Sequence, residues 1–343
     1  MTAKAKRTVS VVVGMVVSGV LIWWLFRDID FAELVRVIKG ANYLWLIPNI
    51  ILIMFTMYQR AYRWRFMLAP IKHVKFPTLI AATCIGFMAN NVLPLRLGEF
   101  VRAYSLSSQD REVSKSASLA TIFVERMVFD LIALLVIFGA VLTYSVGLRE
   151  HINEAMIFGT KLAILIALGG LLAMILLALK ANQISEFLSR YLFFLPQKAS
   201  DFIKSVIVKF SEGLQFLRSF KTVVSISLQT LLIWILMGIS NYFVFLAFGF
   251  ELPIDASFVL LVVVSVSILT PSTPGYLGVY HGAVVISLAV YGMDYDIDKV
   301  EMRACALVLH AAQYIVVTLM GFYFLKKEHL TLKDLEEGVV EEI

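Results

Sequence analysis

Two polar stretches interrupt this apolar sequence, and each contains groups that can bind an anion. The first, residues 90–102, reads NNVLPLRLGEFVR, and the second, residues 271–282, reads PSTPGYLGVYHG. Arginine binds phosphate in a planar, bidentate way, and backbone amides at the start of a helix also bind anions. Proline and glycine in both stretches predict breaks in the surrounding helices. Both stretches are therefore candidates for binding an anionic ligand.

Arg96, Glu99 and Arg102 form the strongest group of charged residues in the first stretch. They lie three residues apart, so a helix that resumes after the proline places all three on one face. Ionisable groups within a membrane are costly and face a polar cavity or each other. A self-satisfied Arg–Glu–Arg cluster is the structural alternative. We favour a phosphate site, in which Glu99 orients the two guanidinium groups and Asn90 and Asn91 add neutral donors.

Three more charged residues interrupt a later apolar run. Arg126 and Asp130 are four residues apart, which fits a structural ion pair on one helical face, and Arg126 is with Glu125 also a candidate substrate contact. Glu125 is expected to face elsewhere. It could approach the arginines of the first stretch, either as a structural partner or as a group that takes up protons.

The second stretch combines helix breakers with polar side chains. Its two prolines interrupt the helix, and Gly275 and Gly278 permit close approach of other backbone. His281 is a candidate proton carrier near neutral pH, although a single histidine is more often a hydrogen-bonded packing residue. The candidate substrate contacts in this stretch are Ser272, Thr273, Gly275, Tyr276, Tyr280 and His281.

The elements that position these residues must cross a membrane. The chain is 60% hydrophobic and only 16% charged, with a mean hydropathy of +0.84, and a spanning helix needs about 20 mostly apolar residues. We predict an all-α polytopic membrane protein with six full spans and two oppositely oriented re-entrant hairpins; eight full spans are the alternative. The predicted spans are Thr8–Phe26, Tyr43–Tyr58, Leu119–Tyr144, Ile157–Leu179, Val223–Phe248 and Ala304–Leu325. The predicted hairpin arms are Phe76–Leu93 with Leu95–Leu106, and Ala256–Thr270 with Tyr276–Tyr291.

Charge placement predicts the orientation. With two hairpins, most lysines and arginines fall on the side of the N-terminus, and the opposite connections are acidic. The chain is thus predicted to be a multi-pass protein of the inner (cytoplasmic) membrane with both termini in the cytoplasm. The net charge of +5 reflects this basic inner face and not nucleic-acid binding. Arg60, Arg63 and Arg65, interleaved with aromatic residues, are predicted to anchor the inner boundary.

The domain organisation follows from this topology. Residues 1–343 form a single membrane domain, in which halves 8–144 and 157–325 form an inverted repeat. Residues 181–221 are predicted to be a cytoplasmic linker with an amphipathic helix, which lies either in the interface or beneath the spans. Residues 328–343 are predicted to be a short, acidic and mobile tail.

These residues resemble a known family, the flippase-like membrane domain of lysylphosphatidylglycerol synthases and their stand-alone relatives. Residues 91–99, NVLPLRLGE, and 271–278, PSTPGYLG, are similar to its two signature motifs, and Glu125-Arg126 with Asp130 is similar to a third. The resemblance covers nearly the whole chain. It implies a protein that moves lipid headgroups between leaflets or serves envelope-lipid assembly. Many members carry Gly-Gly and a later Glu in the second motif, where this chain has Gly275-Tyr276 and His281, so the substrate stays open.

We therefore expect a lipid translocase, not an enzyme, that moves a phosphate-bearing lipid between leaflets. The alternative is a non-transporting, lipid-binding partner of an envelope-lipid enzyme. An intramembrane transferase lacks a convincing nucleophile and acid–base set, and the soluble aminoacyl-transferase domain of the family's synthases is not in this chain. The expected partner is a lipid with an anionic headgroup, with no cofactor, metal or nucleic acid. The sequence leaves open the headgroup, the direction of transport, any coupling ion and the oligomeric state.

Overall fold

The structure is a computed structural model that describes residues 3–93, 97–110, 112–145, 154–191, 211–270, 272–293 and 298–335. Throughout these ranges the chain forms helices joined by turns, and no strand occurs in them. The predicted all-α polytopic membrane protein is confirmed, because five helices are long and apolar enough to cross a membrane, or six if one bent pair counts as a span. Arg96 and Pro271 lie outside the described residues.

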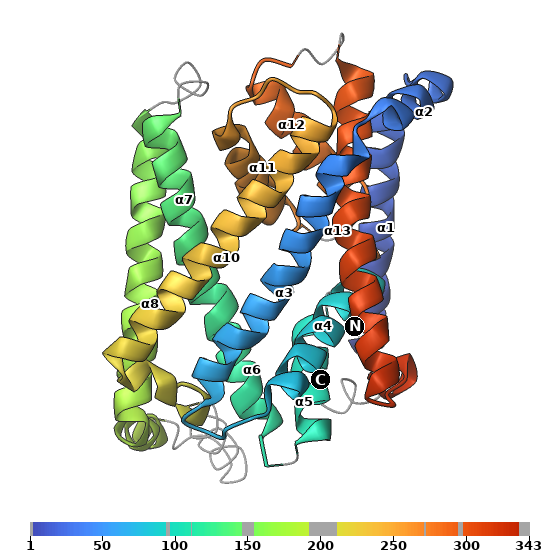
Figure 1. The fold of residues 1–343 in the computed structure, drawn as a ribbon. Coiled ribbons are helices and arrows are strands. Elements are labelled where there is room, and N and C mark those ends of the chain that lie inside the picture. Colours follow the sequence, from blue (N-terminus) through green and yellow to red (C-terminus); the bar gives the residue numbers. More distant parts are fainter. Residues whose placement is uncertain are drawn as a thin grey trace.

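The long helices run between two opposite ends of the molecule (Figure 1). In α1 and α2 the apolar chain bends by 85°, and this is the pair that forms the sixth candidate span. The helices of these spans are α1 (Ala3–Phe26), α2 (Phe31–Gly40), η1 (Tyr43–Trp45), α3 (Leu46–Leu68), α6 (Lys115–Val124), η3 (Glu125–Asp130), α7 (Leu131–Tyr144), α8 (Glu154–Tyr191), α10 (Phe220–Ala247) and α13 (Lys299–Lys327).

Two pairs of shorter helices flank the two polar stretches, residues 90–102 and 271–282, which we call the broken stretches. The first pair is α4 (Phe76–Val92) and α5 (Gly98–Gln109), and the second is α11 (Ile254–Ser267) and α12 (Val279–Val290), with the short η5 (Pro274–Tyr276) between them. The helices of each pair pack against each other. Figure 1 shows α4 and α5 at one end of the molecule and α11 and α12 at the other.

Glycines allow α4 and α5 to approach closely. A Cβ atom on Gly98 would overlap the carbonyl oxygen of Gly86, and one on Gly86 would lie 2.7 Å from the Cβ of Arg102. Asn90 then caps the start of α5, because its Oδ1 accepts a hydrogen bond from the Gly98 N–H at 2.8 Å. At the far end of α5, hydrogen bonds to Asp110 and Glu112 raise the pKa of the Lys72 amine.

The span that contains α6 and α7 is interrupted by a π-helical turn, η3. Residues five apart lie on different faces of an α-helix, but the i→i+5 turn brings them toward the same face. Glu125 and Asp130 are accordingly both buried. The expectation that Glu125 faces away from Asp130 was wrong, because it assumed an unbroken α-helix.

The linker and tail contain more packed structure than the sequence suggested. Helix α8 continues to Tyr191 with a kink at Lys180, whereas residues 192–210 of the predicted amphipathic segment lie outside the described part. After them, Leu214 and Leu217 are buried beneath the spans. Beyond α13 the chain turns back, and Leu335 is buried against α4 and α5. Residues 336–343 also lie outside the described part.

Candidate functional site

Charged side chains from α3, α5 and η3 meet in the interior. Four arginines face three carboxylates, so the described part of the cluster has one excess positive charge (4 − 3 = +1). We call this group the charge cluster. Its members are Arg60 and Arg63 on α3, Glu99 and Arg102 on α5, and Glu125, Arg126 and Asp130 on η3.

Arg63 lies at the centre of the charge cluster and is fully buried. Its Nη2 is 2.9 Å from Oε1 of Glu125, and its Nη1 is 2.8 Å from Oδ1 of Asp130. The same Nη1 donates to the Thr230 hydroxyl on α10 at 2.6 Å. Because Arg63 binds both carboxylates and a third helix, it holds α3, η3 and α10 together.

Arg102 is bound on one side only. Its Nη1 is 2.9 Å from Oε1 of Glu125, and its guanidinium lies 3.9 Å from the centre of the Trp64 ring, which fixes its plane. Its buried Nε and Nη2 atoms have no hydrogen-bond partner among the described residues. An unpaired buried donor is costly. Arg102 can therefore donate further hydrogen bonds to an anionic oxygen.

Arg126 and Glu99 form the loosest part of the charge cluster. Nε of Arg126 is 3.8 Å from Oε1 of Glu99, and its Nη1 is 3.3 Å from Oδ2 of Asp130. Their side chains are 22% and 28% exposed, in contrast to buried Arg63. Asn90 donates a long hydrogen bond of 3.4 Å to the same Glu99 oxygen.

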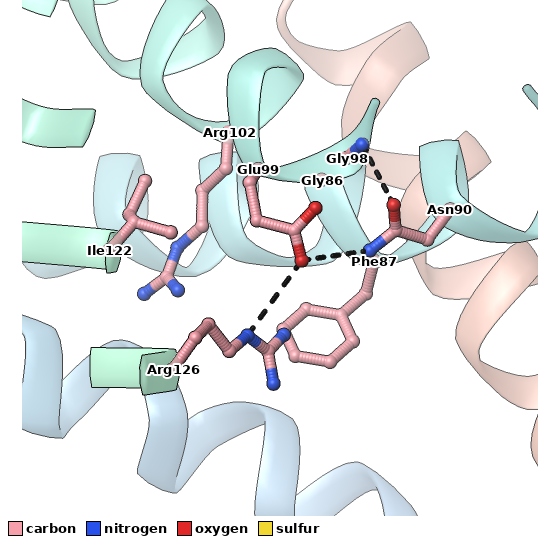
Figure 2. Close-up of a pocket in the computed structure, with 8 residues that line it drawn as sticks. All are labelled: Gly86, Phe87, Asn90, Gly98, Glu99, Arg102, Ile122 and Arg126. Carbon is pink, nitrogen blue, oxygen red and sulfur yellow. Dashed lines mark hydrogen bonds and ion pairs between the residues drawn. The ribbon is translucent and has the colours of Figure 1, made fainter. Parts of the chain in front are cut away.

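These looser side chains line a small pocket between α4, α5, α6 and η3. Figure 2 shows Glu99 between Asn90 and Arg126 in this pocket, with Arg102 beside it. The space holds about one water molecule, so a lipid headgroup does not fit in this conformation. A ligand would enter only if α4 and α5 moved relative to η3.

The prediction that Arg60 and Arg63 form part of an interfacial belt was wrong. Both are buried, and only Arg65 is exposed. Arg60 lies between the rings of Phe87 and Trp234, with its Nη1 3.9 Å from Asp130. Residues three apart share a helical face, whereas Arg65 lies on another. The sequence therefore contained a signal for this ion-pair cluster: two arginines three residues apart on one span, and Glu125 and Asp130 on a later one.

The second broken stretch is neutral and hydrogen-bonded. The Thr273 hydroxyl lies 3.0 Å from that of Ser18 on α1, and the backbone of Ser272 packs against Gly14 on the same helix. Tyr276 has a left-handed backbone conformation, with φ of +59°. The Tyr280 ring stacks on His310 of α13, with centroids 4.7 Å apart.

His281 also contacts His310, a residue that the sequence reading missed. Nε2 of His281 lies 3.3 Å from Nδ1 of His310. His310 stands 29 residues away in an apolar run, and neither spacing nor a flanking motif marks it as a partner. Only the packing of α12 against α13 brings the two rings together.

The two broken stretches meet at α13. Asn91 donates to the Thr318 hydroxyl on α13 at 2.9 Å. A Cβ on Gly275 would lie 2.7 Å from the Tyr314 ring on α13 and 3.5 Å from the Asn91 carbonyl oxygen. The predicted residues thus form two groups, which are linked by Asn91 and α13. No cluster of three or more potential metal ligands occurs in the described ranges.

Comparisons with known proteins identify a family for this chain. The model of the lysylphosphatidylglycerol synthase TM region matches residues 11–321. The chain belongs to this family. The match starts in α1, ends in α13 and includes both broken stretches, so the resemblance seen in the sequence is confirmed.

Another relative has a name that states no activity. A UPF0104 membrane protein of Methanocaldococcus jannaschii is 26% identical over 250 residues, which cover 70% of this chain and 95% of that protein. No solved structure matches the chain. Membership of the lysylphosphatidylglycerol synthase TM family is consistent with a multi-pass membrane protein that has a role related to membrane lipids.

Proposed function

We propose that this protein is a lipid translocase, not an enzyme, that moves a phosphate-bearing lipid between the leaflets of the cytoplasmic membrane. The observation that carries the proposal is the charge cluster, which has an excess positive charge and unpaired donors on Arg102 beside a pocket. Phosphate is the anion that matches this planar set of donors. Family membership supports a lipid as the molecule that bears the phosphate.

The looser ion pairs suggest how the headgroup binds. A phosphate oxygen replaces Glu99 on Arg126, because that pair is long and partly exposed and costs little to break. A second oxygen reaches Nη2 of Arg102. Arg63 keeps its two carboxylates and holds the site in place. The lipid tails remain in the bilayer throughout.

Transport requires the site to open alternately to the two sides. In this proposal α4–α5 and α11–α12 are re-entrant hairpins of the two inverted halves, 8–144 and 157–325. In the same proposal both termini lie in the cytoplasm, and the end of the molecule that contains α4 and α5 faces that side. Contact between the hairpins at Asn91 and Gly275 lets a movement of one affect the other. The small pocket corresponds to the closed state.

A vesicle assay tests this function. The purified protein is reconstituted with a trace of head-labelled phosphatidylglycerol, and a membrane-impermeant quencher measures how fast the inner-leaflet label reaches the outer leaflet. We expect faster exchange than in protein-free vesicles and competition by unlabelled phosphatidylglycerol. Saturable lipid binding without any exchange would contradict transport and would support the alternative, a non-transporting partner of an envelope-lipid enzyme.

A further inference from the structure

His281 of the second broken stretch and His310 of α13 lie in a chain of hydrogen bonds that begins at Gly278. The Gly278 N–H donates to Nδ1 of His281 at 3.3 Å, so this nitrogen carries no proton. The neutral ring then has its proton on Nε2, which lies 3.3 Å from Nδ1 of His310. His310 also lies beside the backbone of Gly275, so both rings are placed at the same turn.

That turn has an unusual backbone. Gly275, Tyr276 and Gly278 all have positive φ angles, of 72°, 59° and 80°. Tyrosine rarely adopts such a conformation, so the surrounding contacts must stabilise it. The hydrogen bond from the Gly278 N–H to His281, and the contact of His281 with His310, provide such contacts.

The surroundings offer no counter-charge to a protonated ring. Within the described ranges neither histidine forms an ion pair, and Phe26 and Tyr280 pack edge-on against His281. Arg303 donates to the carbonyl oxygens of Leu25 and Lys299, and Asp255 accepts from Tyr291. Titratable or charged side chains near this turn include Asp255 on α11, Tyr280 on α12, and Arg303, Cys305 and Tyr314 on α13, and Arg27 follows the end of α1.

We propose that His281 and His310 together form a proton-binding site, and that uptake of one proton releases the turn from Gly275 to Gly278. The neutral pair has two bare nitrogens, and both accept hydrogen bonds. Uptake of one more proton gives the pair three ring protons and leaves only one ring nitrogen that can accept a hydrogen bond. Two N–H groups then face each other either between the rings or at Gly278. Because the hydrogen bond between the rings becomes charge-assisted and is then the stronger of the two, it is kept and the bond at Gly278 is lost.

Release of this turn affects the other broken stretch. Gly275 lies against Tyr314 and the Asn91 carbonyl, and Asn91 is bound to α13 through Thr318. The proton site is therefore connected through described contacts to α4, whose Asn90 donates a hydrogen bond to Glu99 of the charge cluster. This inference does not depend on lipid transport.

Nuclear magnetic resonance of the full chain in lipid nanodiscs tests the proposal. The chain has five histidines, so ring-15N labelling gives few signals. His281→Asn and His310→Asn assign two of them, and exposed His73 and His329 serve as internal references. At neutral pH we expect both buried rings to be neutral with the proton on Nε2.

As the pH is lowered, the pair should take up one proton as a unit, and hydrogen exchange of the Gly278 amide should become about tenfold faster in the same step. The titration is measured on the wild-type chain. The two variants serve only to assign the signals, because each lacks one of the two rings. If the two rings take up protons independently of each other, the proposal is overturned. Protonation without any change at Gly278 would also overturn it. Neither result bears on the phosphate site.

Discussion

Both broken stretches place polar groups inside the molecule, but the first is surrounded by ion pairs and the second by neutral hydrogen bonds. Around the first, arginines and carboxylates compensate one another at high local charge. Around the second, hydroxyls, two histidines and backbone groups form a neutral network. Both regions provide ion-pair or hydrogen-bond partners for polar groups away from water. The first has donors without a partner on Arg102 and so suits an anion, whereas the second has both ring nitrogens of His281 in hydrogen bonds and so responds to a proton.

The largest difference between the two regions should appear when one polar group is removed. Glu125→Gln leaves Arg63 and Arg102 without the carboxylate that both contact, and we expect it to destabilise the fold by about 3–5 kcal/mol. His310→Gln removes a neutral partner and should cost about 1–3 kcal/mol. Thermal unfolding of both variants in one detergent measures this. Equal losses would contradict the contrast between charged and neutral regions.

A second difference concerns how closely the helices pack. Gly98→Ala places a methyl group against the Gly86 carbonyl, and we expect a loss of about 1–3 kcal/mol. Gly282→Ala on α12 is the matched control, because its nearest neighbour is Leu25 at 3.9 Å. The control should be neutral, or more stable by up to about 1 kcal/mol from helix propensity. The same unfolding assay compares them, and a stable Gly98→Ala protein would show that the α4–α5 contact is looser than described.

A smaller effect is expected at the edge of the pocket. Glu99→Gln removes the carboxylate that competes with a phosphate for Arg126 but keeps its shape. The mole fraction of phosphatidylglycerol that gives half-maximal exchange should fall about threefold, which corresponds to a weak, partly exposed ion pair. Stability should change little, unlike in Glu125→Gln. A large loss of stability would instead assign Glu99 to the structural part of the charge cluster.

The sequence predicted the fold class and the family but only part of the site. Glu99, Arg102, Glu125 and Arg126 could be identified because they are charged residues in apolar runs. Ionisable groups are costly within a membrane unless they have charged partners or face a polar cavity. The direction in which Glu125 points depends on a π-helical turn, and helix propensities do not reveal such a turn. The hairpins and the inverted repeat stay predictions.

Other parts of the site depended on contacts between distant segments. Arg60 and Arg63 resembled interfacial anchors because they end a span beside aromatic residues, and only their partners on η3 show that they point inward. His310 contributes through the packing of α12 on α13. Arg96, the first choice from the sequence, lies outside the described residues, so its role stays a prediction.

One pair of variants tests the phosphate site most directly. Arg126→Lys keeps the charge beside the pocket but loses the bidentate fork, whereas Arg65→Lys makes the same change at an exposed position on α3. In the vesicle assay, with equal amounts of folded protein, we predict that Arg126→Lys slows phosphatidylglycerol exchange about tenfold or more and that Arg65→Lys leaves it unchanged. Wild-type exchange by a well-folded Arg126→Lys protein would contradict the account.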